Sequence, residues 1–390
     1  MRSISDAQRR ARLGRRHHLA TPARDVDALT DAIVGLHSSD PATVYLSARA
    51  RVAGLTVTDV ENALYERRSL VRMWGMRRTL FVTSRETAAT MDAACTKATV
   101  GPQHRRLLAA LKAHGIGDTE RWLDEVRART LQALIARGEA SAAELARDVP
   151  ELATKLRYAA GTRSETVVGL STRVLFLLAL EARILRSRPL GTWVSGQYRW
   201  APVRSWLGDE LPPLDPRAAR AELLRRWLRA FGPGTTADVK WWTGWTVAHT
   251  RAAIADVGAI EVALGNGGTG WVLADDVGPV RSTHPWVAFL PGLDATVMGW
   301  KERDWYLGAH ATALFDRNGN AGPTVWCDGS VVGGWAVVAP GEIAFRVLDD
   351  VGAEAMRRIE REAERLSAWL GDVQVTPRFR TPLERELVGG

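Results

Sequence analysis

The chain contains very little cysteine and no long apolar segment. Its 390 residues include two cysteines, Cys95 and Cys327, far apart in the sequence. That number excludes a disulfide framework and a cysteine-rich zinc site, and it suits a reducing compartment. No apolar stretch reaches the roughly 18 residues that a membrane-spanning helix requires. The basic N-terminus has no apolar core of the kind found in secretory signals. We therefore expect a cytoplasmic protein with no membrane partner.

Several sequence motifs of enzymes are also missing. The chain has no G-x-x-x-x-G-K-[ST], no H-E-x-x-H and no G-x-S-x-G, and its eight histidines do not cluster at the spacing of metal ligands. The segment "GNGGTG" at 265–270 lies between two β-like segments, which favours a hairpin turn over a dinucleotide-binding loop. We expect neither a metal nor a cofactor.

Charge of one sign is in excess. The formal net charge is +8 and the pI is about 10.0, and most of the excess is arginine. Arginine binds phosphate in bidentate fashion, so this composition indicates an anionic partner such as double-stranded DNA, although a general bias toward arginine would produce the same numbers. Residues 1–20 form either a basic arm or an amphipathic helix. Most of the 16 tryptophans are expected to pack, and some could stack on bases.

Helical and β-like patterns alternate along the chain. Residues 25–83 suggest three helices followed by a short β element. The third helix, 58–74, begins at Thr58 with Glu61 at capping-box spacing, and it is the candidate DNA-reading helix. A similar outline recurs with a cap at Ser141 and a hairpin wing at 191–202. It recurs again before the predicted hairpin at 259–277.

The expected fold class is α+β, with three tandem winged helix-turn-helix units and a small C-terminal antiparallel β-subdomain. A helix is predicted at 352–371, followed by a last strand and a tail. The expected domains are the N-terminal arm with the first unit at 1–115, the second unit at 116–212, the third unit at 213–290, and the C-terminal subdomain at 291–390.

Two polar segments stand out as candidate sites. In "GLHSSDP", residues 35–41, four polar residues precede Pro41. Asp40 and Pro41 suit the start of a helix, whereas His37 is as compatible with catalysis as with local packing. In "FLPGLDATVMGWKERDW", residues 289–305, Asp294 and Arg303 suit either phosphate binding or a structural ion pair, and we favour the ion pair.

Arginines that suit phosphate contacts lie around these segments, although for any single arginine we favour a place on a solvated charged face. The candidate DNA-contacting residues are Arg49, Arg51, Arg72, Arg77, Arg78 and Arg303.

The two polar segments, together with "RMWGMRRTLFV", "GTWVSGQYRWAP" and "FGPGTTADVKWWTGW", resemble the winged-helix family of bacterial DNA glycosylases known as the AlkZ-like group. The resemblance covers nearly the whole chain. It implies three winged helices that form a C-shaped cleft for DNA, and the excision of bulky alkylated purines or the unhooking of crosslinks. The family motif is Gln-x-Gln or Gln-x-Asp, and His37 and Ser39 stand at its two positions, so both glutamines are absent here.

The resemblance and the residues lead to two hypotheses. The first is a monomeric, nucleoid-associated, monofunctional DNA glycosylase that acts on N7-alkylated purines. In it His37 is a base or proton acceptor, Ser39 orients water or binds phosphate, and Asp40 stabilises positive charge on the sugar. The alternative is a winged-helix DNA-binding protein without catalysis, either a transcriptional regulator or a lesion binder.

Overall fold

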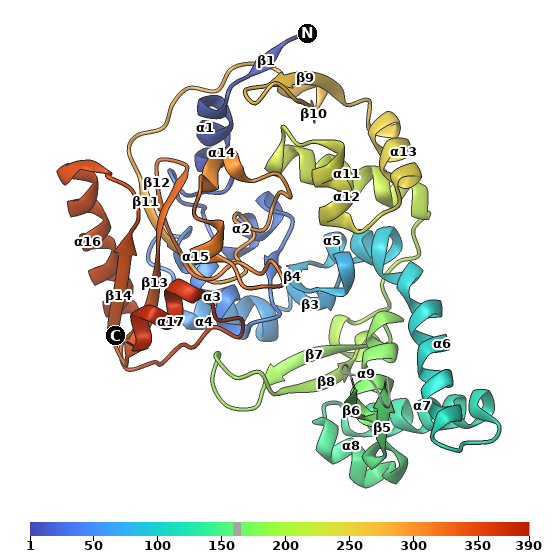
Figure 1. Cartoon of the computed structure of the whole chain (residues 1–390). Coiled ribbons are helices and arrows are strands. Elements are labelled where there is room, and N and C mark those ends of the chain that lie inside the picture. Colours follow the sequence, from blue (N-terminus) through green and yellow to red (C-terminus); the bar gives the residue numbers. More distant parts are fainter. Residues whose placement is uncertain (159–164, 390) are drawn as a thin grey trace.

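The computed structural model describes residues 1–158 and 165–389, and it is a mixed α and β structure with small sheets (Figure 1). Most strands pair in antiparallel fashion, and one short parallel pair joins the N-terminus to the middle of the chain. Within the described ranges, no helix combines the length and the apolar character that crossing a bilayer demands. The fold class α+β with small antiparallel sheets is therefore confirmed.

The first part of the chain surrounds a three-stranded sheet of order β2-β4-β3. Its elements are β1 (Ser3–Ile4), α1 (Asp6–Arg16), α2 (Val26–Ala32), β2 (Leu36–His37), α3 (Pro41–Arg49), α4 (Val57–Glu61), η1 (Asn62–Glu66), β3 (Leu70–Trp74), η2 (Met76–Arg78) and β4 (Leu80–Ser84).

The predicted reading helix at 58–74 is wrong in its second half. The N-cap lies two residues earlier, at Thr56, because Thr56 and Asp59 form the capping box, and the helix ends in the π-turn η1. Residues 70–74 then form strand β3, which pairs with β4 along its whole length. The segment "LVRMW" is buried almost throughout, so pairing with the sheet outweighs its helical spacing.

The N-terminal arm is not a free basic tail. Strand β1 pairs in parallel with a strand near residue 263, and helix α1 buries Arg9 and Arg12 against the body. Arg12 donates to the Asp276 carboxylate at 2.9 Å and to the Gly278 carbonyl oxygen at 2.6 Å. These arginines bind the protein itself, because their charges are matched within the fold.

A lobe extends from the body through helix α6 and returns through a hairpin (Figure 1). Its elements are α5 (Arg85–Met91), η3 (Asp92–Thr96), α6 (Lys97–Ala113), α7 (Thr119–Arg137), α8 (Ala142–Asp148), η4 (Pro150–Ala153), β5 (Lys155–Tyr158), β6 (Thr166–Gly169), α9 (Leu170–Leu180), β7 (Ile184–Pro189), β8 (Tyr198–Pro202) and α10 (Val203–Leu207). The capping box at Ser141 and Glu144 is confirmed. The predicted wing contributes only β8, whose partner β7 precedes the predicted segment.

The third stretch packs three helices beside a hairpin. Its elements are α11 (Pro216–Phe231), α12 (Thr236–Thr243), α13 (Val247–Val257), β9 (Ile260–Leu264), β10 (Thr269–Val272) and η5 (Ala274–Asp276). The hairpin turn predicted at 265–270 is confirmed, because β9 and β10 pair across it.

The C-terminal part is built on a four-stranded antiparallel sheet in which β11, β12, β13 and β14 are neighbours in chain order. Its elements are β11 (Val287–Leu290), α14 (Asp304–Leu307), α15 (Ala311–Leu314), β12 (Thr324–Cys327), β13 (Ser330–Ala339), β14 (Glu342–Val347), α16 (Gly352–Leu370) and α17 (Pro382–Gly389). The helix predicted at 352–371 is confirmed as α16. The predicted last strand is wrong, because its described residues are irregular or belong to helix α17.

One hydrophobic core joins the N-terminal and C-terminal parts. Tyr45, Leu70 and Val82 share a cluster with Phe289 and Trp335 from the C-terminal sheet and with the apolar side of α16. The sheet of 287–347 therefore shares a hydrophobic core with α3 and β3. This shared core determines where the segment 35–41 lies.

Candidate active site

The segment 35–41 crosses from the first sheet into helix α3. Leu36 and His37 pair with Val82 and Phe81 of β4, and the Ser38 amide donates to the Leu80 carbonyl oxygen at 2.8 Å. The three polar residues His37, Ser38 and Ser39 are thus held at the end of a short strand. Because the backbone there is hydrogen-bonded to β4, it has little freedom, and the positions of the three side chains are restricted.

Asp40 caps helix α3. Its Oδ1 accepts from the Ala42 amide at 3.2 Å, its Oδ2 accepts from the Arg378 amide at 2.9 Å, and Pro41 occupies the first helical turn. Burial raises the pKa of Asp40, and the two amide hydrogen bonds oppose that rise. The helix-start interpretation of Asp40 and Pro41 is confirmed.

His37 lies in the interior with its ring edge against Phe81, at 5.5 Å between ring centroids. The side chain is only 8% exposed. Burial, together with the positive charge of Arg77, lowers the pKa of His37 to about 3. Its Nδ1 accepts from the Ser39 amide at 3.4 Å, so the neutral ring carries its proton on Nε2. The expectation that His37 acts as a base is therefore replaced by that of a neutral hydrogen-bonding group.

Ser38 has a role that the sequence did not suggest. Its Oγ accepts from Arg72 Nε at 2.8 Å, and Arg72 Nη1 also donates to the Tyr65 hydroxyl at 3.1 Å. Arg72 is 2% exposed and stacks over Tyr198. Arg72 was expected to contact DNA, but it is enclosed and positions Ser38 instead. Its place between Val71 and Met73 in an apolar strand was the local signal for burial.

Arg378 is a second residue that sequence reasoning missed. Besides its amide, its Nη1 donates to the Ser39 carbonyl oxygen at 3.1 Å. It joins the tail of the chain to the candidate site from 339 residues away. No local pattern could indicate a contact over that separation.

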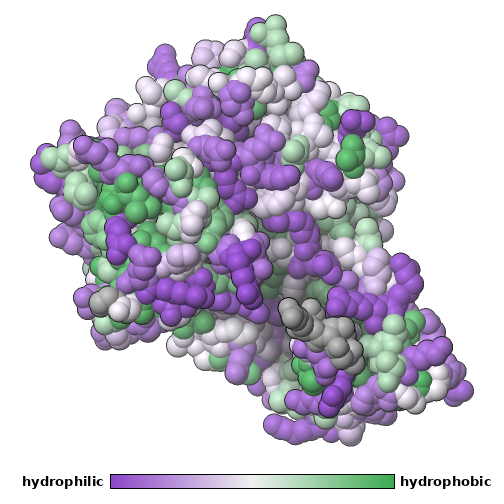
Figure 2. Space-filling model, viewed as in Figure 1, coloured by the Kyte–Doolittle hydropathy of each residue, from purple (hydrophilic) through white to green (hydrophobic). Residues whose placement is uncertain are grey.

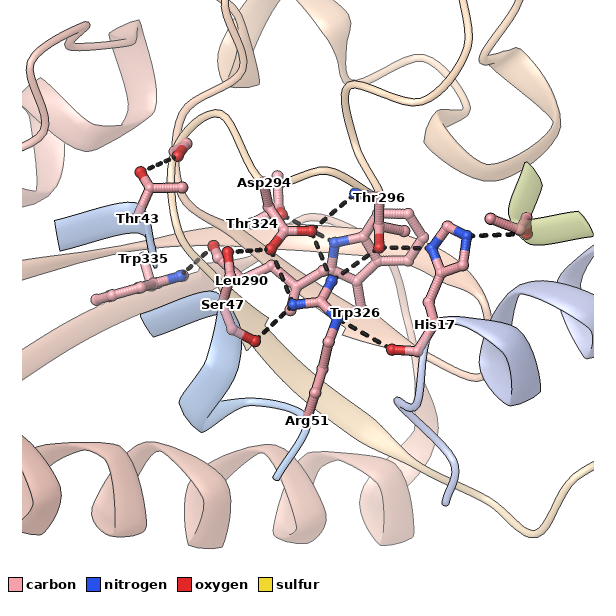
Figure 3. Close-up of polar contacts among 12 residues, drawn as sticks. His17, Thr43, Ser47, Arg51, Leu290, Asp294, Thr296, Thr324, Trp326 and Trp335 are labelled. Atoms are coloured by element: carbon pink, nitrogen blue, oxygen red, sulfur yellow. Dashed lines mark hydrogen bonds and ion pairs between the residues drawn. The ribbon is translucent and has the colours of Figure 1, made fainter. Parts of the chain in front are cut away.

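Two further candidate DNA contacts, Arg51 and Arg49, form ion pairs within the protein. Arg51 and Asp294 are both fully buried and form two hydrogen bonds, Nη2 to Oδ1 at 2.7 Å and Nη1 to Oδ2 at 2.9 Å (Figure 3). Burial raises the pKa of Asp294, but the Arg51 charge and hydrogen bonds from Arg51, Ser47 and the Thr296 amide outweigh it and lower that pKa. Arg49 pairs with Glu362 of α16. Asp294 does belong to a structural ion pair, as favoured, but its partner is Arg51, so the expectation is wrong for Arg303.

One side of helix α3 is fastened to the loop that follows β11 (Figure 3). Thr43 donates to the Gly292 carbonyl oxygen at 2.7 Å, Ser47 donates to Asp294 Oδ2 at 2.5 Å, and Arg51 continues the row. A spacing of four residues places these side chains on one helix face. The row fixes α3, and with it the preceding segment 35–41.

His17 extends this network toward helix α11 (Figure 3). Its Nε2 bonds to the Ala230 carbonyl oxygen at 3.1 Å and its Nδ1 to Thr296 Oγ1 at 2.7 Å. Because a carbonyl oxygen can only accept, the Nε2 nitrogen carries the proton. Burial and the neighbouring Arg51 lower the pKa of His17 to about 3.

We expect the two buried histidines to make stability depend on pH. Their folded pKa values, about 3, lie below the usual 6.5, so the unfolded chain binds more protons between those values. The stabilisation is complete above about pH 6.5 and is lost as the pH falls, by about 2 kcal/mol per histidine at pH 5. Urea denaturation at pH 7 and pH 5 measures the difference.

The matched variants sharpen this prediction. His37→Gln should reduce the difference in unfolding free energy between the two pH values by about half, since two groups contribute. His249→Gln, which changes an exposed side chain on α13, should leave it unchanged. Equal stability of the wild type at both pH values would contradict the assignment.

Arg77, Arg78 and Arg303 are the candidate DNA-contacting residues that remain available. Arg77 stacks over Trp241 at 4.1 Å and Arg303 lies 5.1 Å from the same ring. Burial and the charge of Arg303 lower the pKa of Arg77. Among residues 1–158 and 165–389 no acidic side chain lies within ion-pair distance of these three arginines, so their charges are unmatched there.

The turn that carries Arg77 and Arg78 is strained. Both residues have positive φ, 53° and 57°, a backbone conformation that costs side-chain-bearing residues about 1–3 kcal/mol. Gly244 at the end of α12 leaves room for it, since a Cβ there would lie 3.1 Å from Arg77 Cγ. Strained backbone of this kind concentrates at functional sites.

The segment 30–369 matches the sequence profile of a family described as DNA glycosylase AlkZ-like. The chain belongs to the AlkZ-like DNA glycosylase family. Among solved structures, Streptomyces sahachiroi DNA glycosylase AlkZ is similar over 97% of this chain and 100% of its own length, with a TM-score of 0.73 and 20% identity. At that identity the likeness shows a shared fold. None of the curated proteins matches the chain.

This family member has no candidate metal centre in the described part of its chain, where no three His, Cys, Asp or Glu side chains are grouped as ligands. Its polar segment at 35–41 is instead held by hydrogen bonds to backbone and to arginine. Ser39 Oγ has no hydrogen-bond partner among the described residues and is partly exposed. His37 and Ser39 are therefore the side chains with capacity left for water or substrate.

Proposed function

We propose that the protein is a monofunctional DNA glycosylase that hydrolyses the N-glycosidic bond of N7-alkylated purines, including bulky or crosslinked adducts, in double-stranded DNA. Membership of the AlkZ-like family supports the reaction class. The observation that carries the site assignment is the pair His37 and Ser39, held at the end of β2 with free hydrogen-bonding capacity. We further propose that the protein acts as a monomer whose three helical stretches are winged-helix units around a C-shaped cleft.

The chemistry requires little acid or base strength. An N7-alkylated purine is cationic, so when its bond to C1′ breaks, the electron pair neutralises the departing base. The sugar is left as an oxocarbenium-like species that water attacks. A neutral His37 can donate from Nε2 to the water oxygen, while Ser39 Oγ accepts one of the water protons. Such a pair positions water much as two amide side chains would.

Asp40 contributes negative charge beside this pair. Both of its oxygens already accept backbone amides, so its role in the proposal is electrostatic stabilisation of the positive sugar. Its other role, the cap of α3, holds the pair in place. Removing the charge would therefore affect both structure and rate.

Arg77, Arg78 and Arg303 supply the proposed phosphate contacts. They are unpaired among the described residues, and guanidinium groups bind phosphate oxygens in bidentate fashion. Contacts of this kind position the duplex without reading its sequence. We propose that they hold the strand whose sugar lies next to His37.

The proposed activity is tested by a panel of lesions. Duplex DNA carrying a single N7-alkylguanine, a bulkier N7 adduct or an interstrand crosslink is incubated with the protein, treated with alkali and examined for strand cleavage. We expect cleavage at the lesion and none in undamaged duplex. If the protein binds the DNA but leaves every lesion of the panel intact, the glycosylase assignment is contradicted.

The same panel distinguishes the glycosylase proposal from the alternative, a DNA-binding protein without catalysis. The burial of His37 at 8% exposure is the observation that favours it. It predicts intact lesions together with binding that weakens steeply as salt rises, because arginines displace counterions from phosphates. A sequence-specific footprint would then identify a regulator, and a preference for damaged DNA a lesion binder.

A further inference from the structure

A cavity of about 650 Å³ lies where the lobe meets the body. It is bounded by β3 and the turn at Arg77, by α6 and α9, and by the β7–β8 hairpin. On the face drawn in Figure 2, hydrophilic side chains surround the recess between the lobe and the body. A volume of several hundred Å³ suits an organic ligand the size of a nucleotide.

The described walls of the cavity carry positive charge. They include Arg77, Arg78, Arg106, Arg173 and Arg186, and no acidic side chain lines the cavity within residues 1–158 and 165–389. Within the described ranges none of these arginines has an ion-pair partner. The Nε atoms of Arg173 and Arg186 are buried without a hydrogen-bond partner. Buried donors of this kind are costly unless a ligand satisfies them.

Flat rings form another part of the wall. Arg186 sits among Trp74, Tyr198 and Trp200, with 5.3–5.6 Å between its guanidinium carbon and the ring centroids. Phe176 packs edge-on against Trp74 at 4.8 Å. Burial, aggravated by neighbouring Arg72 and Arg378, lowers the pKa of Arg186 to about 10. An anion in the cavity would relieve that repulsion.

We propose that this cavity binds one nucleotide of a DNA strand that has left the duplex, with its phosphates on the arginines and its base against the aromatic wall. A nucleotide combines the two properties the cavity displays, an anionic group and a flat ring that stacks. An apolar adduct would leave the arginines unpaired, and inorganic phosphate would leave the rings unused. The proposal deepens the proposed function and rests on it for the choice of DNA.

The cavity is coupled to the candidate active site through two arginines. Arg72 holds Ser38 Oγ and stacks on Tyr198, whose ring lines the cavity. Arg77 lines the cavity, and its charge adds to burial in lowering the pKa of His37. Through Arg72 and Arg77 a nucleotide held in the cavity would act on the segment 35–41, although no residue of that segment lines the cavity.

Binding to a single-stranded oligonucleotide tests the proposal with the full chain. Fluorescence anisotropy of labelled dT12 is measured at low and moderate salt for the wild type and for Arg106→Gln/Arg173→Gln. We expect roughly tenfold or greater weakening in the double variant, together with a shallower salt dependence. The control Arg105→Gln/Arg183→Gln removes the same charge from exposed positions outside the cavity and should weaken binding far less.

Further arms identify the source of the ligand and keep the two proposals apart. Thymidine monophosphate should bind much more weakly than dT12. If it instead binds as tightly as dT12, and the double variant weakens that binding, the cavity is a site for free nucleotides and the strand proposal is overturned. Equal losses in the test and control variants would overturn it as well.

Two outcomes keep the two proposals apart. If the double variant loses dT12 binding but the wild type cleaves no lesion, the cavity assignment stands and the glycosylase function is rejected. If the wild type cleaves lesions but the double variant binds dT12 as well as the wild type, the glycosylase function stands and the cavity assignment is rejected. Thermal unfolding confirms that both variants are folded.

Discussion

His37→Ala is expected to reduce the rate of lesion excision by about a hundredfold or more, which is the range lost when a positioned hydrogen-bonding group is removed. The variant leaves the attacking water without its donor at Nε2, and Ser39 alone cannot orient it. Single-turnover cleavage of duplex DNA with one N7-alkylguanine measures the effect. DNA binding should change little, since the proposed phosphate contacts are untouched.

Two companion variants make this result specific. His37→Gln keeps a neutral hydrogen-bonding side chain of similar volume, so it should retain activity within about tenfold of the wild type. His249→Ala, at an exposed position on α13, should behave as the wild type. Full activity of His37→Ala would remove His37 from the mechanism.

The pH profile gives an independent check on the same residue. A His37 pKa of about 3 means that kcat/KM should show no titration near pH 6.5 from this group. A profile that falls with a midpoint near pH 6.5 in the wild type, and loses that midpoint in His37→Gln, would instead make His37 a general base. The two outcomes separate positioning of water from proton transfer.

Arg51→Met is expected to destabilise the protein by about 3–5 kcal/mol, because it leaves the buried Asp294 carboxylate without its cation. Both side chains of the pair are fully buried. The loss also loosens Thr296 and the adjoining His17, which bond to the same network. Urea denaturation at pH 7 gives the free energy of unfolding.

The exposed pair of Arg24 and Asp25 is the matched comparison. Its N–O distance is 2.7 Å, equal to the shortest Arg51–Asp294 distance, but the Arg24 side chain is 83% exposed. Arg24→Met should cost far less stability than Arg51→Met, because solvent screens an exposed pair. The double variant Arg51→Met/Asp294→Leu should recover much of the loss, because no unpaired buried charge remains. Similar losses for Arg24→Met and Arg51→Met would contradict the role given to burial.

Local features of the fold were largely predictable from the sequence. The Ser141 capping box, the hairpin at 265–270, helix α16 and the Asp40–Pro41 helix start each depend on residues a few positions apart. Their hydrogen bonds form within one turn, so residue type and spacing determine them. The failure at 70–74 has the opposite cause: the spacing of apolar residues permits a helix, but pairing with β4 makes this segment a strand.

The candidate site likewise has features that the sequence predicts and features that only the structure shows. Its location at 35–41 followed from a polar segment and a family resemblance, whereas the states of its residues depend on distant parts of the chain. Burial against Phe81 and the charge of Arg77 decide that His37 is neutral. Arg72 and Arg378 hold the neighbouring residues.

The sequence by itself determined the family, the position of the candidate site, the excess of arginine and the short-range caps and turns. Only the tertiary structure decided which arginines are free. Arg51 and Arg72 resemble Arg77 and Arg78 in the sequence, but the first two are enclosed while the second two line an open cavity. The reason is physical: a charge must be matched where it is buried, and its partner, such as Asp294, can lie hundreds of residues away.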